Sequence, residues 1–180
     1  MSKMHKFVAV LAVAALAACS DPTTESTPAA AVEAVPASVP PQTQQPEITA
    51  NGLVRNVAVD GVPYQAEVAS LQGDTLVSTG NPGFLMYGPY APLAAGKYRL
   101  TVQGEVGAMT EGAQLLIDVA SQAGATSHGE TVVSTPMAGQ DSIADIEFTL
   151  QNAVPDLEVR AQVTEGAQVK IRSYQIVAAE

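Results

Sequence analysis

The chain of 180 residues is acidic: 18 Asp and Glu stand against 8 Lys and Arg, which gives a formal net charge of −10 at pH 7. Binding to nucleic acid or to anionic lipid headgroups requires clustered basic residues, so this composition excludes both classes of ligand. A single cysteine leaves no partner for an internal disulfide, and no cofactor or metal motif is present. A folded domain in this chain must therefore be held together by its apolar core.

The amino-terminal segment has the pattern of a targeting signal. Lys3 and Lys6 precede an apolar run over residues 7–18, which ends at Cys19. This run is too short to span a bilayer core, which takes roughly 20 residues, but a basic start and a small-residue end are typical of a secretory signal. An ordinary signal peptide with an incidental cysteine is the alternative to the more specific interpretation that follows.

The sequence Leu-Ala-Ala-Cys that ends at Cys19 resembles the bacterial lipoprotein signal. The resemblance implies that residues 1–18 are removed and that Cys19 carries the lipid, including palmitate, that attaches the protein to the membrane. Two acyl chains suffice for stable attachment. Ser20 follows the cysteine, which by resemblance to enterobacterial sorting favours the outer membrane over the inner one.

Residues 19–47 differ in composition from the rest of the chain. Six prolines are spread among Ala, Ser, Thr, Gln and Glu, with few large apolar residues between them. Proline removes backbone donors, and a segment with so little apolar surface cannot offset the entropy of ordering. We expect a disordered tether that separates the lipid anchor from a folded domain.

Residues 48–180 have the usual length of one domain, and their pattern is that of β-structure. Apolar and polar residues alternate, as in half-buried strands, over residues 97–106, 114–120, 143–150, 157–163 and 168–177. An Asp-Gly pair at 60–61 predicts a tight hairpin between residues 53–59 and 62–71. We therefore predict an all-β domain, a two-sheet antiparallel β-sandwich.

The five residues Thr-Glu-Gly-Ala-Gln occur twice, at 110–114 and at 164–168. Each copy leads into an expected strand, and its glycine suits a left-handed turn position. Both copies therefore resemble the turn of a hairpin. Repeated turn chemistry explains the repeat more simply than a duplicated ligand loop does.

The Gly-Pro-Tyr of residues 88–90 and the Ala-Gly-Lys-Tyr-Arg-Leu of residues 95–100 resemble a segment of jelly-roll modules. Those modules are similar to carbohydrate-binding modules and are appended to bacterial glycosyltransferases. The Leu-Ile-Asp-Val of 116–119 and the Leu-Glu-Val-Arg-Ala of 157–161 resemble later strands of the same group. The resemblance implies a jelly roll and, by analogy, a role in sugar binding.

Catalytic patterns are weak in this sequence. His128 follows Ser127, but the only other histidine, His5, lies in the signal, and neither HExxH nor GxSxG occurs. Four acidic residues of the expected strands could in principle form a catalytic pair or a calcium site: Asp118, Asp145, Glu147 and Glu158. Strand carboxylates more often form a solvated face, so we predict that the protein is not an enzyme.

Six residues form the predicted ligand-binding set: Tyr87, Tyr90, Arg99, Asp118, Glu147 and Arg160. The two tyrosines flank a Gly-Pro turn, where an exposed ring can stack on a sugar or, alternatively, pack over the edge of the core. The four charged residues occupy the polar register of their strands, so they form one face if their sheets align. Such a face can hydrogen-bond to hydroxyl groups.

These observations predict a lipid-anchored, non-catalytic binding module of the cell envelope, facing the periplasm or the outer membrane. Its expected ligands are glycans or other envelope components. The alternative is a structural or assembly lipoprotein that contacts another envelope protein through a sheet edge or face. A glycan binder should gather its tyrosines and polar strand residues in one concave patch, whereas a protein partner prefers an apolar patch or an unpaired edge strand.

Overall fold

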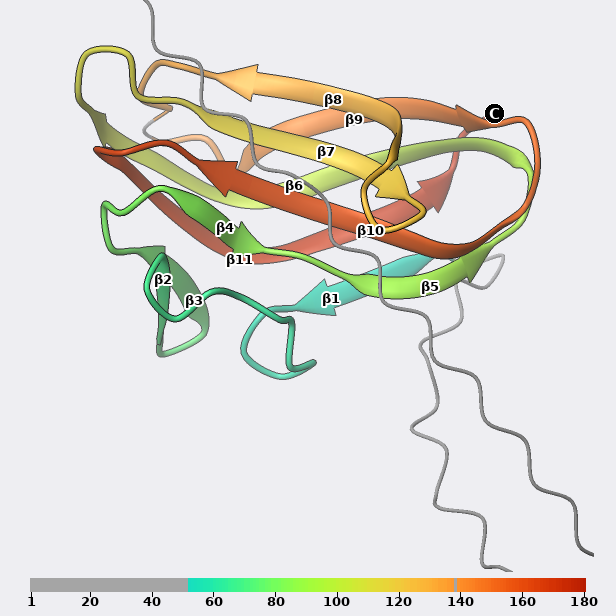
Figure 1. The fold of residues 1–180 in the computed structure, drawn as a ribbon, viewed down its shortest axis with the longest axis horizontal. Coiled ribbons are helices and arrows are strands. Elements are labelled where there is room, and N and C mark those ends of the chain that lie inside the picture. Colours follow the sequence, from blue (N-terminus) through green and yellow to red (C-terminus); the bar gives the residue numbers. More distant parts are fainter. Residues whose placement is uncertain (1–51, 138) are drawn as a thin grey trace, which may run out of the picture. The chain divides into compact units, whose positions relative to one another are not determined.

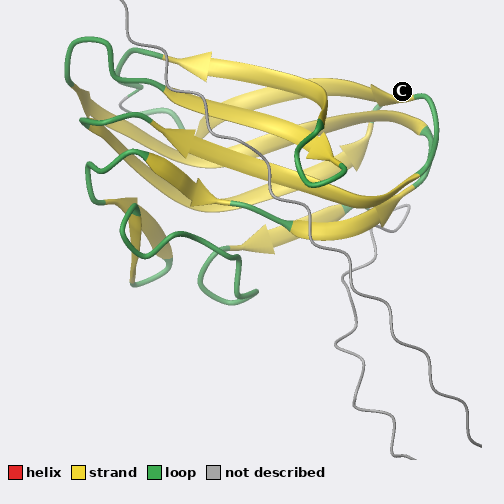
Figure 2. Ribbon diagram, in the orientation of Figure 1, coloured by secondary structure: helices red, strands yellow, loops and turns green. Residues whose placement is uncertain are grey.

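The computed structural model describes residues 52–180 apart from Ala138. The predicted lipid anchor at Cys19 and the predicted tether over residues 19–47 therefore lie outside the described residues. Within the described part, no helix is long and apolar enough to cross a membrane. Figure 2 shows strands joined by loops throughout this part of the chain.

One sheet is built around the long central strands β6 and β11. Its order is β2, β3, β11, β6 and β9, with β1 also paired to β11 beside β3. The strands of this first sheet are β1 (Leu53–Asn56), β2 (Ala69–Gln72), β3 (Thr75–Ser78), β6 (Gly96–Met109), β9 (Ser142–Leu150) and β11 (Ala167–Ala178). Every recorded pairing is antiparallel.

The second sheet has β10 and β7 at its centre. Its order is β4, β10, β7 and β8, with β5 also paired to β10 beside β4. Its strands are β4 (Gly83–Met86), β5 (Pro89–Leu93), β7 (Leu115–Ser121), β8 (Thr126–Val133) and β10 (Val154–Val163). Figure 1 shows the two sheets stacked as a sandwich, which confirms the all-β prediction.

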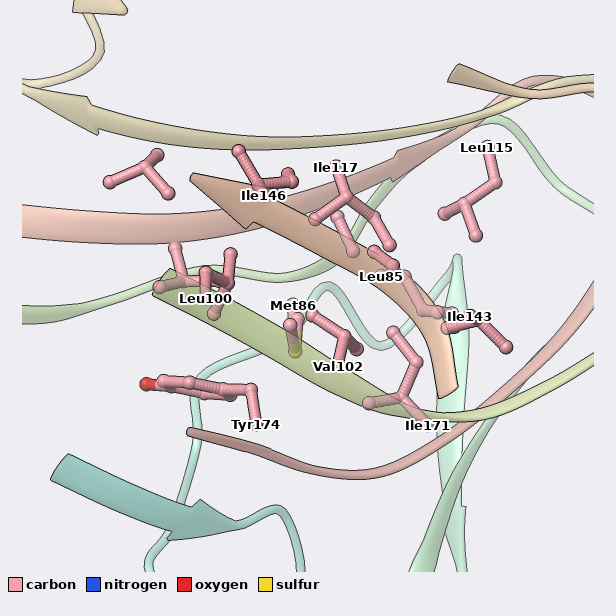
Figure 3. Close-up of a cluster of buried hydrophobic side chains, with 14 of the residues drawn as sticks. Leu85, Met86, Leu100, Val102, Leu115, Ile117, Ile143, Ile146, Ile171 and Tyr174 are labelled. Carbon is pink, nitrogen blue, oxygen red and sulfur yellow. The ribbon is translucent and has the colours of Figure 1, made fainter. Parts of the chain in front are cut away.

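Side chains from both sheets meet in one apolar core, as the predicted alternation requires. Leu100 and Val102 of β6 are fully buried and share a face, and Ile117 of β7 points toward them from the second sheet (Figure 3). Tyr174 of β11 is also buried in this cluster. At one margin the rings of Tyr98 and Phe148 stack, with their centroids 5.6 Å apart. The core therefore lies between the sheets, and polar strand residues lie on the two outer faces.

The Asp-Gly pair at 60–61 does not form the expected hairpin. β1 ends at Asn56, where the backbone turns, and the Asn56 N–H donates to Asp60 Oδ2 at 2.6 Å. The hairpin lies later, where Gly73 and Asp74 connect β2 to β3. Asp60 therefore uses its carboxylate to close a local turn.

The repeated Thr-Glu-Gly-Ala-Gln turns connect the two sheets, contrary to the expected hairpins. The first copy joins β6 to β7 and the second joins β10 to β11, and in each case the two strands belong to different sheets. The copies lie side by side: Gln114 N donates to Thr164 Oγ1 at 2.7 Å, and Thr164 N donates to Gln114 O at 3.0 Å. Gly166 lies so close to Thr110 that an added Cβ would be 2.0 Å from Thr110 Oγ1.

Candidate functional site

The predicted charged residues fall into two pairs on different sheets. Arg160 of β10 lies directly opposite Asp118 of β7 in the second sheet. Arg99 of β6 lies directly opposite Glu147 of β9 in the first sheet. The expectation that all four form one face is therefore wrong, because alternation shows which side of a strand a residue occupies but not which sheet the strand joins.

The Arg160–Asp118 pair is fixed on the outer face of the second sheet. Arg160 Nε donates to Asp118 Oδ1 at 3.0 Å, and Nη2 makes a second short bond to Oδ2. Only 20% of the Arg160 side chain and 6% of the Asp118 side chain are exposed. The bond to Asp118 raises the pKa of Arg160, so the guanidinium is held both in place and in its charged form.

Aromatic residues of β4, of the β4–β5 connection and of the start of β5 lie beside this pair. The ring of Phe84 lies 5.8 Å from Arg160 Cζ, which is within the range of a cation–π contact. The rings of Phe84 and Tyr87 meet edge to face at 6.4 Å. Tyr90 is 37% exposed and has a φ of +58°, a left-handed conformation that is costly for a bulky residue. The chain thus holds the Tyr90 ring at the surface despite local backbone strain.

The loop between β7 and β8 covers the other side of Arg160. Gln122 and Ala123 also have positive φ, and Tyr90 is the remaining non-glycine residue of this kind in the described part of the chain. Gln122 N donates to Asp156 Oδ2 at 2.9 Å, which ties the loop to the start of β10. A Cβ added to Gly124 would lie 1.8 Å from Arg160 Nη1. The guanidinium therefore lies directly against the backbone at Gly124.

These elements line an open pocket of about 240 Å³, smaller than the roughly 300–1,000 Å³ that is usual for drug-sized ligands. Its lining residues are Gln65, Phe84, Tyr87, Tyr90, Ala123, Glu158 and Arg160. The side-chain oxygen of Gln65 accepts a bond from Phe84 N at 2.7 Å, which leaves its amide nitrogen as the donor. The pocket therefore combines aromatic rings, hydrogen-bond donors and a carboxylate.

Glu158 is the carboxylate in this pocket. The residue is 4% exposed, and its Oε1 atom has no hydrogen-bond partner. Burial raises the pKa of Glu158, the charges of Asp156 and Asp118 raise it further, and the charge of Arg160 lowers it. Burial and the charge of Glu158 also raise the pKa of Tyr90. A buried acceptor without a donor costs free energy, so a donor that reached this atom would stabilise the site.

His128 lies outside this pocket. Its Nε2 atom is 2.9 Å from the Oγ atom of Ser121, which is 1% exposed, whereas the neighbouring Ser127 is exposed. The structure thus pairs His128 with a buried serine on the adjacent strand and not with Ser127. Within residues 52–137 and 139–180, no group of three or more His, Cys, Asp and Glu side chains is placed to hold a metal ion.

The Arg99–Glu147 pair lies on the exposed outer face of the first sheet. Arg99 Nη2 makes a short contact to Glu147 Oε1, and Arg99 Nε lies 3.6 Å from Asp145 Oδ1. About half or more of each of these three side chains is exposed, at 47% for Arg99, 67% for Glu147 and 52% for Asp145. These residues lie apart from the two tyrosines and from the pocket.

Of the six predicted ligand-binding residues, the structure brings Tyr87, Tyr90 and Arg160 to the pocket, with Asp118 holding Arg160. Sequence reasoning did not include Glu158 in this set, although its position two residues before Arg160 on an alternating strand places both on one face. Phe84, Gln65 and Ala123 were also missed. Nothing in their sequence context indicates that they meet, because pairing of distant elements brings them together.

No protein-family model matches the chain, and neither does any curated protein. Among solved structures, the chain is similar to the C-terminal CBM6 of LamC, a marine laminarinase from Zobellia galactanivorans. The identity is 18%, the TM-score is 0.48, and the match covers 71% of this chain and 99% of that one. It is also similar to a chain of the Glycosylation Associate Protein (Gap123) complex from Streptococcus agalactiae, at 15% identity and a TM-score of 0.45. That match covers 71% of this chain but 25% of the other.

Proposed function

We propose that residues 52–180 form a non-catalytic glycan-binding module, and that the pocket lined by Tyr87, Tyr90, Glu158 and Arg160 receives the sugar. One observation carries the proposal: two tyrosines and two charged strand residues line the same concave site. That arrangement is the one expected of a glycan binder. The exposed large apolar residues away from the pocket, in contrast, are spread over β1, β2, β8 and the turns that follow β1.

The polar groups of the pocket match the chemistry of sugar hydroxyls. A hydroxyl both donates and accepts a hydrogen bond, so it can bond to a carboxylate and a guanidinium at the same time. Glu158 Oε1 lacks a donor, and Arg160 is already oriented by its two bonds to Asp118. A sugar bound here therefore meets groups that are fixed before it arrives, which reduces the entropic cost of binding.

The aromatic residues supply the apolar part of the site. The C–H face of a sugar ring packs on an aromatic ring, and Tyr90 presents a ring that is 37% exposed at the rim of the pocket. The volume of about 240 Å³ suits one sugar unit of a longer chain, with the rest of the glycan outside. Affinity for a single unit at such a site is modest, so repeated ligands favour binding.

The test is binding of the full-length protein to an array of envelope polysaccharides, with Tyr90→Ala as the variant. Tyr64 provides a matched control, because it is also 37% exposed but does not line the pocket. We expect Tyr90→Ala to lose binding and Tyr64→Ala to keep it. Melting temperatures measured beside the array show whether either variant is unfolded, and Tyr90→Gly removes the ring while it relieves the strained φ.

Failure of the wild-type protein to bind any glycan would reject this function and favour the alternative of an assembly lipoprotein. Equal loss of binding in Tyr64→Ala and Tyr90→Ala would reject the pocket as the site. Loss of stability in Tyr90→Ala that Tyr90→Gly shares would indicate that the ring is part of the core margin.

The proposed location is the cell envelope, with attachment through a lipid on Cys19 and the outer membrane favoured by Ser20. This proposal rests on the sequence pattern of residues 1–20. Cys19→Ala, followed by cell fractionation and labelling with an alkyne fatty acid, tests it. We expect the wild type alone to take up the label. A wild type without label, together with a variant that stays in the membrane fraction, would reject the anchor.

A further inference from the structure

We infer that the pocket selects sugars that carry a free amino group over their acetylated and acidic counterparts, and that Glu158 is the residue responsible. This inference rests on the proposed glycan-binding function and specifies its ligand class. It follows from three features of the pocket: a buried carboxylate with one oxygen that lacks a hydrogen-bond partner, a cation whose charge is already offset, and the aromatic rings at its wall.

The first feature is the carboxylate of Glu158, which lines the pocket and is 4% exposed. Its Oε1 atom has no hydrogen-bond partner, although buried polar atoms in proteins are nearly always bonded. A bound group that donates a hydrogen bond to Oε1 removes this deficit. A donor that also carries positive charge compensates the carboxylate more fully than a neutral donor, because it adds direct Coulomb attraction to the hydrogen bond.

The second feature is the charge balance around the pocket. Arg160 is the one cationic side chain among the lining residues, and both of its recorded bonds go to Asp118. Asp156 lies two residues before Glu158 on β10, and its buried Oδ1 atom also lacks a partner. When the side chains of this group are all ionised, the one positive and three negative charges leave a net charge of −2; the group comprises Arg160, Asp118, Asp156 and Glu158. The local field therefore attracts a cation and repels an anion.

The electrostatic influences on Glu158 agree with this balance. Asp156 and Asp118 act to raise its pKa, burial acts in the same direction more strongly, and only Arg160 opposes them. An ammonium group beside Glu158 would stabilise its ionised form. An acidic sugar would add a fourth negative charge to the same site.

The third feature is aromatic. Tyr87, Tyr90 and Phe84 contribute rings to the wall of the pocket, and the face of an aromatic ring attracts a cation within about 6 Å. A protonated amine can therefore contact both a carboxylate and a ring face here. An N-acetyl group, in contrast, is neutral, offers a single N–H donor and is bulkier, and the pocket measures only about 240 Å³.

Ligand-observed NMR titration of the full-length protein tests the inference with four monosaccharides: glucosamine, N-acetylglucosamine, glucose and glucuronic acid. We expect glucosamine to bind about tenfold more tightly than N-acetylglucosamine and glucose, and glucuronic acid to bind most weakly. Glu158→Gln should reduce the glucosamine preference to about twofold or less while weak glucose binding remains. Glu111→Gln is the matched control, because it removes the same charge from an exposed turn.

The outcomes separate the two proposals. A wild type that binds glucose and glucosamine equally, or prefers glucuronic acid, overturns the selectivity while the glycan-binding function stands. A glucosamine preference that Glu158→Gln retains, or that Glu111→Gln reduces as strongly, assigns it to general attraction by an acidic protein and overturns the role of Glu158. Binding that disappears with a chelator assigns the carboxylate to a metal ion and also overturns it. Absence of all sugar binding rejects both proposals.

Discussion

The two Arg–carboxylate pairs, one on each sheet, have the same chemistry but differ in their surroundings. Both join residues directly opposite each other on neighbouring strands. The Arg160–Asp118 pair is 20% and 6% exposed, whereas the Arg99–Glu147 pair is 47% and 67% exposed. The strands supply the same chemistry in both places, so the difference comes from their positions: β9 is an edge strand, whereas β7 and β10 lie inside their sheet and have other segments over them.

The covering segments add to that difference. The β4–β5 connection brings Tyr87, and the start of β5 brings Tyr90, to the pocket beside Arg160, while the β7–β8 loop brings Gly124 against Arg160. Cover of this kind lowers the local dielectric constant and strengthens each charge interaction. The candidate site is therefore a product of these segments and an ordinary strand pair. Breaking one pair at a time shows whether this distinction is real.

The largest expected effect is that of Asp118→Asn. The change keeps the size of the side chain but leaves the charge of Arg160 without a counter-charge in a mostly buried site. We expect the free energy of unfolding to fall by about 3 kcal/mol, near the lower end for one-sided disruption of buried pairs, because the amide oxygen still accepts one hydrogen bond. Urea denaturation followed by circular dichroism measures this loss.

Glu147→Gln is the comparison variant for that experiment. It breaks the equivalent pair on the first sheet, where both side chains are exposed and screened by water. We expect little change in the urea midpoint. Similar losses in the two variants would contradict the distinction between the covered and the open pair.

A smaller effect is expected from Gly124→Ala, which tests the β7–β8 loop itself. The added methyl group meets Arg160 Nη1 and occupies a backbone position with a φ of +82°. Gly112→Ala is the matched control, because Gly112 has a φ of +79° and open space around its Cβ direction. Both should lose about 1 kcal/mol from the left-handed backbone.

The difference between the two glycine variants isolates the contact with Arg160. We expect Gly124→Ala to lose further stability and to weaken ligand binding, since the guanidinium must move. Equal losses in the two variants would show that the loop does not press on Arg160.

A further small effect is expected from Glu158→Gln, and it depends on pH. Burial and the charges of Asp156 and Asp118 raise the pKa of Glu158 in the folded state, and the charge of Arg160 acts in the opposite direction. Tyr87 and Tyr90 line the same pocket. Above the ordinary glutamate range the folded protein then retains a proton that the unfolded chain has lost. The free energy of unfolding therefore falls as pH rises from that range through the raised pKa.

Glu158→Gln removes this decline, because glutamine has no proton to release. We expect the variant to be more stable than the wild type at neutral pH and to show a flatter stability profile above the ordinary glutamate range. Denaturation curves collected across the acidic and neutral range measure it. If the stability of the wild type instead rises with pH over the same window, and that of Glu158→Gln rises less, the pKa of Glu158 is lowered and not raised.

The sequence predicted the central strands well, because their alternation is dictated by a core on one side. β6, β7, β9, β10 and β11 correspond to the five alternating segments, with ends that differ by a few residues. The edge strand β8 was missed, since its residues 126–130 are polar or Gly and show no alternation of apolar and polar residues. Edge strands bury less surface and so carry a weaker pattern.

The candidate site was predicted only in part, for a related reason. The alternation placed Asp118 and Arg160 on outward faces, and the Gly-Pro turn drew attention to Tyr87 and Tyr90. Which sheet each strand joins depends on pairings between segments far apart in the chain, and local patterns do not encode them. Arg99 and Glu147 were therefore grouped with a site from which the fold separates them.

The contact between the two Thr-Glu-Gly-Ala-Gln turns has a kinetic consequence. Gln114 and Thr164 are bonded across 50 positions of sequence, and their bonds continue the β7–β10 ladder beyond the Leu115–Val163 pair. Such a contact requires closure of a long loop, which costs conformational entropy before the pairing is gained. Because non-local pairings of this kind slow folding, we expect the joining of the two turns to be among the features that make this sandwich fold slowly.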